Sequence, residues 1–290
     1  MKKMYVFFMT ICVSCMFQFL FADSIHPAPY KIVLDKDWRL MVKQQSQHGS
    51  NGAGYVRPAG ESEQDFEKRM LKSAEKGKVK SQYQLGCFYY DKQRFEEAFN
   101  WFRKAADQGM SKAQYEAGLC YLNGEGTAMN QEQAFKWFMQ SAGQGNPLAE
   151  FQVGNCYKDG IGISPDIKQA LSWWSAAAKH KSADAQFALG YHFYTGQDVA
   201  RDYDQAFKWF SKSADANNAY AQNYMGKCSY EGNGVKKDTA KAYTWWLIAI
   251  QNGYNDAIDS RDMAEEFLSP DQVTNAKKEA QRWLLVHMQD

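Results

Sequence analysis

Few residues in this chain have the types and spacing that enzyme chemistry requires. One Ser-x-x-Lys sequence, from Ser73 to Lys76, could place a lysine beside a serine nucleophile. The Ser-Asp-Asn and Lys-Thr-Gly sequences that accompany it in penicillin-recognising enzymes are absent from the chain. A nucleophile elbow, a His-Glu-x-x-His zinc sequence and a dinucleotide-binding glycine pattern are absent too. The sequence therefore predicts no catalytic residue and no cofactor.

The cysteines are the other candidates for chemistry, and their spacing indicates buried thiols. Four of the six lie beyond the apolar N-terminal segment: Cys87, Cys120, Cys156 and Cys228. The last three occupy one position of a 36-residue repeat, which His192 takes in the fourth unit. Helices of neighbouring units pack about 8–10 Å apart, whereas a disulfide requires Cα atoms within roughly 7 Å. We expect free thiols here and no metal site.

The repeat itself is marked by tryptophans at intervals of 36 residues: Trp101, Trp137, Trp173, Trp209 and Trp245. An alanine stands three residues before each tryptophan, and a second aromatic residue follows each one directly. A constant period of this size is typical of stacked supersecondary units that bury their apolar faces against each other. We expect Trp173, in the middle of the array, to be a large buried aromatic side chain between adjacent units.

A second series with the same period predicts another helix in each unit. Glycines recur at Gly118, Gly154, Gly190 and Gly226, among small and aromatic residues at helical spacing. We expect a neighbouring helix to pass so close to each glycine that a side chain would not fit. Gly-x-Gly sequences follow in most units, and without a preceding strand they indicate tight helix connections rather than a phosphate cradle. The second helices close at Gly109, Gly145 and Gly253, with Lys181 and Asn217 in the same register.

The full pattern is Ala-Gln-Tyr/Phe-x-x-Gly-x-x-Tyr-x-x-Gly-x-Gly, then Ala-x-x-Trp-aromatic and a closing Ala-x-x-x-Gly. Between about Lys80 and Gly253 it resembles the Sel1-like repeat, a relative of the tetratricopeptide repeat. The resemblance implies an all-α, right-handed solenoid of stacked antiparallel helix pairs, with about five 36-residue repeats and terminal cap helices. The first unit departs, because four residues fewer separate Gly86 from Ala98 than separate Gly118 from Ala134.

The resemblance also bears on function. It implies a role in binding protein partners and identifies no partner. Some secreted members of the family are described as weak β-lactamases, so a β-lactamase or penicillin-binding hydrolase is the alternative function. Cysteine-rich bacterial relatives bridge the two helices of each unit by disulfides, and that scheme is impossible here because no second helix contains a cysteine.

The chain divides into five segments. Lys2 and Lys3 before an apolar run, with Ala22 at its end, predict a signal peptide over residues 1–22; an uncleaved membrane anchor is the alternative. Residues 23–63 are expected to form a flexible segment, since much of it is rich in Gln, Ser, Gly and Asn. The remaining segments are a cap helix at 64–77, five repeats at 78–253 and C-terminal cap helices at 254–290.

Helix geometry predicts where a partner binds. If the first helices line a concave side, the positions three before and one, four and five after each glycine face that groove. Aromatic, amide and lysine side chains at these positions suit an extended peptide or a helix. The predicted binding residues are Tyr90, Tyr115, Asn155, Lys158, Phe187, Tyr191, Tyr194, Lys227 and Tyr230.

Charge excludes some partner classes. The chain has 34 basic and 33 acidic side chains, so loss of Lys2 and Lys3 with the signal leaves 32 against 33, a net charge near −1. This balance gives no electrostatic basis for binding nucleic acid or an anionic membrane. We therefore expect a monomeric, exported bacterial scaffold, periplasmic or secreted, which binds a protein or peptide and is not inserted in a membrane after signal cleavage.

Overall fold

The computed structural model describes residues 55–197 and 199–287, which form thirteen α-helices, one 3-10 turn and no β-strand. The first helix is α3 (Glu63–Glu75). Five helix pairs follow: α4 (Val79–Asp91) with α5 (Phe95–Asp107), α6 (Ser111–Asn123) with α7 (Gln131–Ala142), α8 (Pro147–Asp159) with α9 (Ile167–Lys179), α10 (Ala183–Thr195) with α11 (Tyr203–Asp215), and α12 (Ala219–Glu231) with α13 (Thr239–Gln251). The 3-10 turn Asn255–Ala257, α14 (Ile258–Glu265) and α15 (Pro270–His287) complete the array. The predicted signal peptide and most of segment 23–63 lie outside the described residues.

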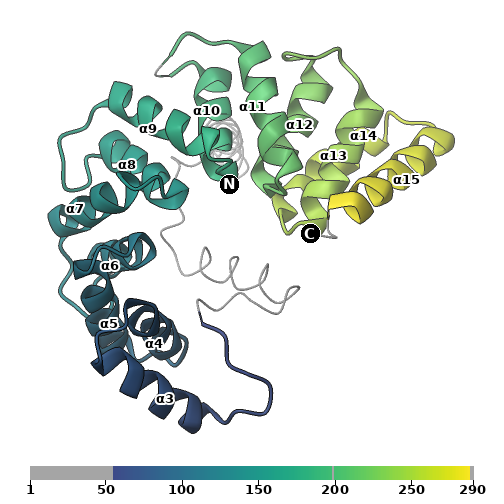
Figure 1. The fold of residues 1–290 in the computed structure, drawn as a ribbon. Helices are drawn as coiled ribbons and strands as arrows, with labels where there is room; N and C mark the ends of the chain where they lie inside the picture. Colours follow the sequence, from purple (N-terminus) through teal and green to yellow (C-terminus); the bar gives the residue numbers. More distant parts are fainter. Residues whose placement is uncertain (1–54, 198, 288–290) are drawn as a thin grey trace, which may run out of the picture. The chain divides into compact units, whose positions relative to one another are not determined.

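The pairs stack in chain order as a solenoid of the predicted all-α class. Each first helix packs most extensively on the second helix of its own pair, and each second helix then packs on the next first helix. In Figure 1 the pairs follow a curve, with α4, α6 and α8 on its inner side and α7 and α9 on its outer side. Neighbouring first helices can therefore present a continuous row of side chains.

The recurring helix glycine has the packing role that the sequence predicts. A Cβ atom built on Gly154 would lie 2.4 Å from the Trp174 ring, and one on Gly190 would lie 2.7 Å from the Phe210 ring. The corresponding glycines of the other three units meet Phe102, Phe138 and Trp246 at 2.5 to 2.6 Å. An aromatic ring of the second helix therefore lies directly against the backbone of the first helix.

The residue that fills this space is the aromatic after the periodic tryptophan, which corrects the expected burial. Trp174 is 1% exposed, whereas Trp173 is only half-buried. Trp137 packs on Ala105 and Ala106 of the preceding unit and on Ala113 and Ala117 of its own. The periodic tryptophan thus lies at a boundary between units and is covered less completely than its neighbour, because it extends past the helix pair instead of into it.

A glutamine in the first turn of most first helices ties successive helices together. The side-chain amides of Gln82, Gln114, Gln186 and Gln222 donate to the carbonyls of Ala74, Ala106, Ala178 and Ala214 near the ends of the preceding helices. The Gln82, Gln114 and Gln222 oxygens accept in turn from Gln108, Gln144 and Asn252. In the third unit buried Glu150 replaces the glutamine and contacts His180 Nδ1 at 2.8 Å. In the fourth unit Ala216 holds the position of Gln108, Gln144 and Asn252 and has no side-chain donor. The Gln186 side-chain oxygen is therefore buried without a partner.

The helix ends follow the predicted turn chemistry. Gly109, Gly145 and Gly253 have φ values of +87°, +77° and +94°. Lys181 and Asn217 adopt the same left-handed conformation at φ +65° and +61°. At the last helix, Ser269 and Gln272 each donate a backbone N–H to the other's side chain, which is the reciprocal capping expected from the sequence. Trp283 of that helix packs edge-on against Trp245.

Candidate functional site

Three of the nine predicted binding residues are buried in the interhelical core. Tyr115 is 5% exposed and packs on Phe138, and Phe187 is 2% exposed and packs on Phe210. Asn155 is 2% exposed, and its Oδ1 accepts a hydrogen bond from Trp174 Nε1 at 3.0 Å. These positions look toward the groove on an isolated helix, but the adjacent helices cover them in the stacked array. Asn155 therefore serves the core.

Three others are half-buried and distributed along the array. The Tyr90 hydroxyl donates to Glu125 Oε2 at 2.9 Å, in the Gly-x-Gly loop of the next unit. Lys158 lies 3.5 Å from the Asp159 carboxylate. The Tyr230 ring packs on Trp246, and Lys237 Nζ lies 5.3 Å from the centre of the Tyr230 ring. The structure does not bring these three side chains together.

The remaining residues meet around Tyr224, which the sequence did not single out. The Tyr224 ring centre lies 5.5 Å from Phe187, 5.8 Å from Tyr191 and 5.3 Å from Tyr194. Lys227 Nζ lies 4.7 Å from the same centre. Tyr220 joins through its ring contact with Phe187 at 5.8 Å. We call this set, from α10 and α12, the Tyr224 cluster: Phe187, Tyr191, Tyr194, Tyr220, Tyr224 and Lys227.

The Tyr224 cluster combines a buried base with an accessible rim. Phe187 and Tyr224 are buried, Tyr191, Tyr194 and Lys227 are half-buried, and Tyr220 is 42% exposed. The Tyr194 hydroxyl donates to Glu231 Oε2 at 2.7 Å, which fixes the ring at one edge. Tyr220 has the most exposed ring of the cluster, and it stands six residues before Gly226. That position lies one turn beyond the row three before the glycine, so helical spacing alone could have identified it.

Burial shifts the ionisation of the groups in the cluster. Desolvation raises the pKa of Tyr191, and desolvation followed by the hydrogen bond to Glu231 raises that of Tyr194, so both stay neutral donors. Desolvation also lowers the pKa of Lys227, partly opposed by the nearby Glu231 carboxylate. An ammonium group held out of water gains more from a new acceptor than one in water does. The Lys227 ammonium can therefore form a strong hydrogen bond with a carboxylate or carbonyl oxygen.

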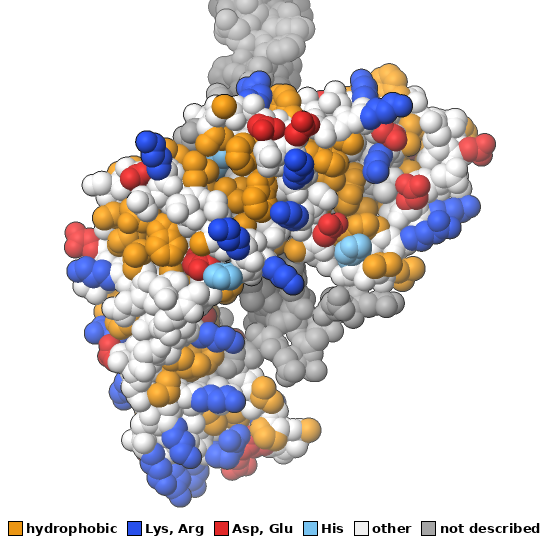
Figure 2. All heavy atoms as spheres, turned by 45° about the horizontal axis from the view of Figure 1, so that its top comes forward, with side chains coloured by type: hydrophobic (Ala, Val, Ile, Leu, Met, Phe, Trp, Pro, Cys, Tyr) orange, Lys and Arg blue, Asp and Glu red, His pale blue; other side chains and the backbone are white. Residues whose placement is uncertain are grey.

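Surface chemistry along the array is mixed. Figure 2 shows apolar side chains gathered in the middle of the face in view, with Lys and Arg side chains between and around them. A depression of about 430 Å³ lies among α4, α6 and the start of α8, with Tyr83, Lys112, Glu116 and Leu148 among its lining residues. It lies on the first helices, like the Tyr224 cluster.

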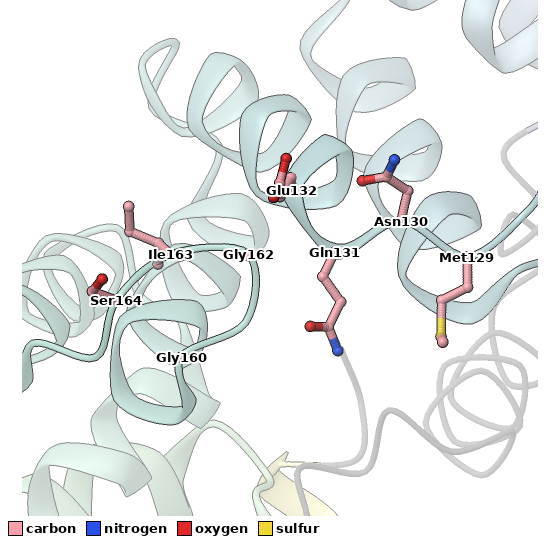
Figure 3. Close-up of a pocket in the computed structure, with 8 residues that line it drawn as sticks. All are labelled: Met129, Asn130, Gln131, Glu132, Gly160, Gly162, Ile163 and Ser164. Atoms are coloured by element: carbon pink, nitrogen blue, oxygen red, sulfur yellow. The ribbon is translucent and has the colours of Figure 1, made fainter.

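A larger, more open depression of about 830 Å³ has a structural origin. Figure 3 shows that the loop with Gly160, Gly162, Ile163 and Ser164 runs beside the segment that leads into α7. A Cβ on Gly162 would lie 2.2 Å from the Gln131 carbonyl oxygen, so the loop rests directly on the backbone of the preceding unit. This contact bears out the prediction that the glycine loops are tight connections.

The serine, the cysteines and the possible metal ligands that the sequence offered lie in surroundings typical of structural residues. Ser73 Oγ lies 2.7 Å from Ser81 Oγ, and within the described residues no hydrogen bond links it to Lys76. All four cysteines of the described residues are free, and desolvation raises the pKa of the Cys156 and Cys228 thiols to about 12. No His, Cys, Asp and Glu side chains of residues 55–197 and 199–287 form a metal-binding group of three. None of the helices in these ranges is long and apolar enough to span a bilayer.

Comparison with known proteins identifies the repeat. The Sel1 repeat family model matches five consecutive segments: residues 79–110, 111–146, 147–182, 183–218 and 219–254. The first match is four residues shorter than the others, in line with the shortened first unit. No curated protein sequence matches the chain at a significant level.

Two solved structures share the architecture. A protective antigen present in uropathogenic Escherichia coli strains, with an SLR fold, matches at 28% identity and a TM-score of 0.72, over 86% of this chain and 53% of its own. A Sel1 repeat protein from Oxalobacter formigenes matches at 30% identity and a TM-score of 0.66, over 78% of this chain and 65% of its own. The chain thus spans between about half and two thirds of these structures. Sel1 repeat proteins generally mediate protein–protein interactions and are typically non-enzymatic scaffolds. The matches cover more than half of its length, and the chain therefore belongs to the Sel1 repeat family.

Proposed function

We propose that this protein is an exported, non-enzymatic scaffold that binds a peptide or an extended protein segment on the Tyr224 cluster. The observation that carries the proposal is the convergence of five aromatic rings and one partly desolvated lysine, with Tyr220 at an open rim. Aromatic side chains dominate binding energy at protein interfaces, and polar groups among them orient the partner. The partner is a protein or peptide, and the scaffold acts as a monomer.

The proposed export rests on residues 1–22, whose two lysines and apolar run have the composition of a secretory signal. N-terminal sequencing of the protein from its own bacterium should begin at residue 23, in a periplasmic or culture fraction. Intact Met1 in a membrane fraction would instead favour an uncleaved anchor. Turnover of nitrocefin by the purified protein would overturn the non-enzymatic part of the proposal.

Selection from a random peptide library on the full mature chain tests the binding surface. Replacing Tyr191 and Tyr220 together by alanine should weaken binding of the selected peptides by about tenfold or more, since aromatic side chains that a partner can reach carry much of the binding energy at an interface. Replacing Met129, which is 67% exposed and belongs to the loop before α7, should leave them unaffected. The melting temperatures of both variants must stay near that of the wild type. Selection of no peptide, or equal binding by the Tyr191 and Tyr220 variant, would contradict the proposal.

A further inference from the structure

Asp184 is a carboxylate that is partly removed from water and has no cationic partner among the described residues. It lies in the first turn of α10, half-buried, and its Oδ1 accepts a hydrogen bond from Asn218 Nδ2 at 3.0 Å. No ion pair within residues 55–197 and 199–287 includes it, and desolvation raises the pKa of its carboxyl group to about 6, partly opposed by the Asn218 bond. A carboxylate kept from water with one neutral partner is unfavourable in the unbound protein.

The repeat does not explain the carboxylate. The equivalent positions, six residues before each helix glycine, hold Lys80, Lys112, Leu148 and Tyr220. An acid near a helix N-terminus is favourable, but Ser182 already caps α10 by accepting from the Ala185 N–H. The helix N-terminus and the bond to Asn218 both favour an acceptor here, but a neutral amide could supply it, and no ion pair of the described residues neutralises the charge that the carboxylate adds.

Asp184 stands beside the rim of the Tyr224 cluster. Phe187 follows it by one turn on α10, and the Phe187 and Tyr220 ring centres are 5.8 Å apart. Asn218, which holds the carboxylate, precedes Tyr220 by two residues at the start of α12. Tyr254 extends the aromatic wall, with its ring centre 5.0 Å from that of Tyr220. A carboxylate next to aromatic faces suits a cation, which can pair with the acid and lie over the rings.

We propose that the partner presents a lysine or arginine side chain here, with its charged end on Asp184 and its aliphatic stem against the exposed Tyr220 ring. The inference rests on the proposed function and specifies the chemistry of the bound segment. Lys227 adds a second requirement at the other end of the cluster. It lies seven residues further along the repeat register than Asp184, which corresponds to roughly 10–14 Å between helix turns. An extended segment covers that distance in about three or four residues, so an acidic residue or a terminal carboxylate should stand at that spacing from the basic residue.

The peptide selection described above tests this chemistry through Asp184→Asn, which keeps the shape of the side chain and removes its charge. Basic residues should be enriched among peptides that bind the wild type, and Asp184→Asn should weaken such a peptide by about tenfold or more. The same peptide with the basic residue replaced by norleucine should bind both proteins equally. Asp204→Asn is the matched control, since Asp204 is the second residue of α11 and is exposed; it should change nothing.

Stability separates a binding role from a structural one. Asp184→Asn should melt a few degrees above the wild type at pH 7, because it removes a desolvated charge, and this advantage should disappear as pH falls through about 6 toward 4 and Asp184 takes up a proton. Lower melting of the variant at pH 7 would assign Asp184 to the structure and overturn the inference. Peptides that depend on Tyr191 and Tyr220 but show no basic residue linked to Asp184 would overturn this inference alone. Selection of no peptide would overturn the proposed function as well.

Discussion

At the residue scale, the residue after the helix glycine determines whether an indole N–H of the second helix has a hydrogen-bond acceptor. Asn155 accepts the Trp174 N–H, and in the second unit Leu119 and Phe138 hold the equivalent positions without any polar atom. In the fifth unit the tryptophan is Trp246, but Lys227 replaces the asparagine and has no acceptor. The Trp246 Nε1 is correspondingly buried without a partner. The three units show a matched polar pair, a matched apolar pair and a mismatch.

A double-mutant cycle should expose this pairing. Asn155→Leu alone leaves the Trp174 N–H unpaired, and Trp174→Phe alone leaves the Asn155 Oδ1 unpaired while Nδ2 still donates to Gln152 Oε1, so each should lower the free energy of unfolding by about 1–3 kcal/mol. The double variant recreates the Leu119 and Phe138 pair and should lose clearly less than the sum. Chemical denaturation of the four proteins measures the difference. Strict additivity would show that the two side chains do not share a hydrogen bond.

The thiols give a second test at this scale. Desolvation raises the pKa of Cys156 and Cys228 to about 12 and also raises that of Cys87, so the native thiols remain protonated and unreactive near pH 8. A thiol reagent should therefore react slowly with the native mature chain. After denaturation without reductant it should consume about four equivalents, one for each free cysteine. A denatured titre near zero would demonstrate disulfides and contradict the structure.

At the element scale, the helix pair is held by an aromatic ring against a glycine, and the sequence predicts only part of this. Period and spacing predict the two helices, their stops and the need for glycine at Gly190. They do not predict that Phe210 rather than Trp209 meets it, because periodicity shows which residues repeat and not which ones touch. The burial of Asn155 was unpredictable for the same reason, since its cover comes from a ring 19 residues away.

Gly190→Ala tests the close contact within a pair. Its Cβ would lie 2.7 Å from the fully buried Phe210 ring and 3.2 Å from the Ala206 carbonyl oxygen, so the helices must separate. We expect a loss of about 1–3 kcal/mol in the free energy of unfolding, as for other overpacked cores. Gly143→Ala is the control, because Gly143 is exposed with φ of −60° and a Cβ there would meet only the Met139 and Gln140 carbonyl oxygens of the helix it ends, at 3.3 and 3.6 Å. Equal stability of the two variants would refute the close contact.

At the scale of the whole molecule, stacking creates a surface that no single unit has. The Tyr224 cluster needs α10 and α12 side by side, and Asp184 reaches it through Asn218, the N-cap residue of α12. Tyr191, Tyr194 and Lys227 were predictable as surface candidates from their register. Tyr224, Asp184 and their mutual contacts were not, because the approach of successive first helices depends on the packing of the whole array.

Amide hydrogen exchange of the full chain, with and without a saturating selected peptide, tests whether a partner binds on the first helices α10 and α12. Bound peptide should slow exchange in α10 and α12, at residues 183–195 and 219–231, with smaller changes in α7 and α9. The Tyr191 and Tyr220 double variant should show no such protection at the same peptide concentration. Protection confined to the second helices or to the glycine loops, with α10 and α12 unchanged, would show that the peptide binds elsewhere and that the Tyr224 cluster is not the binding surface.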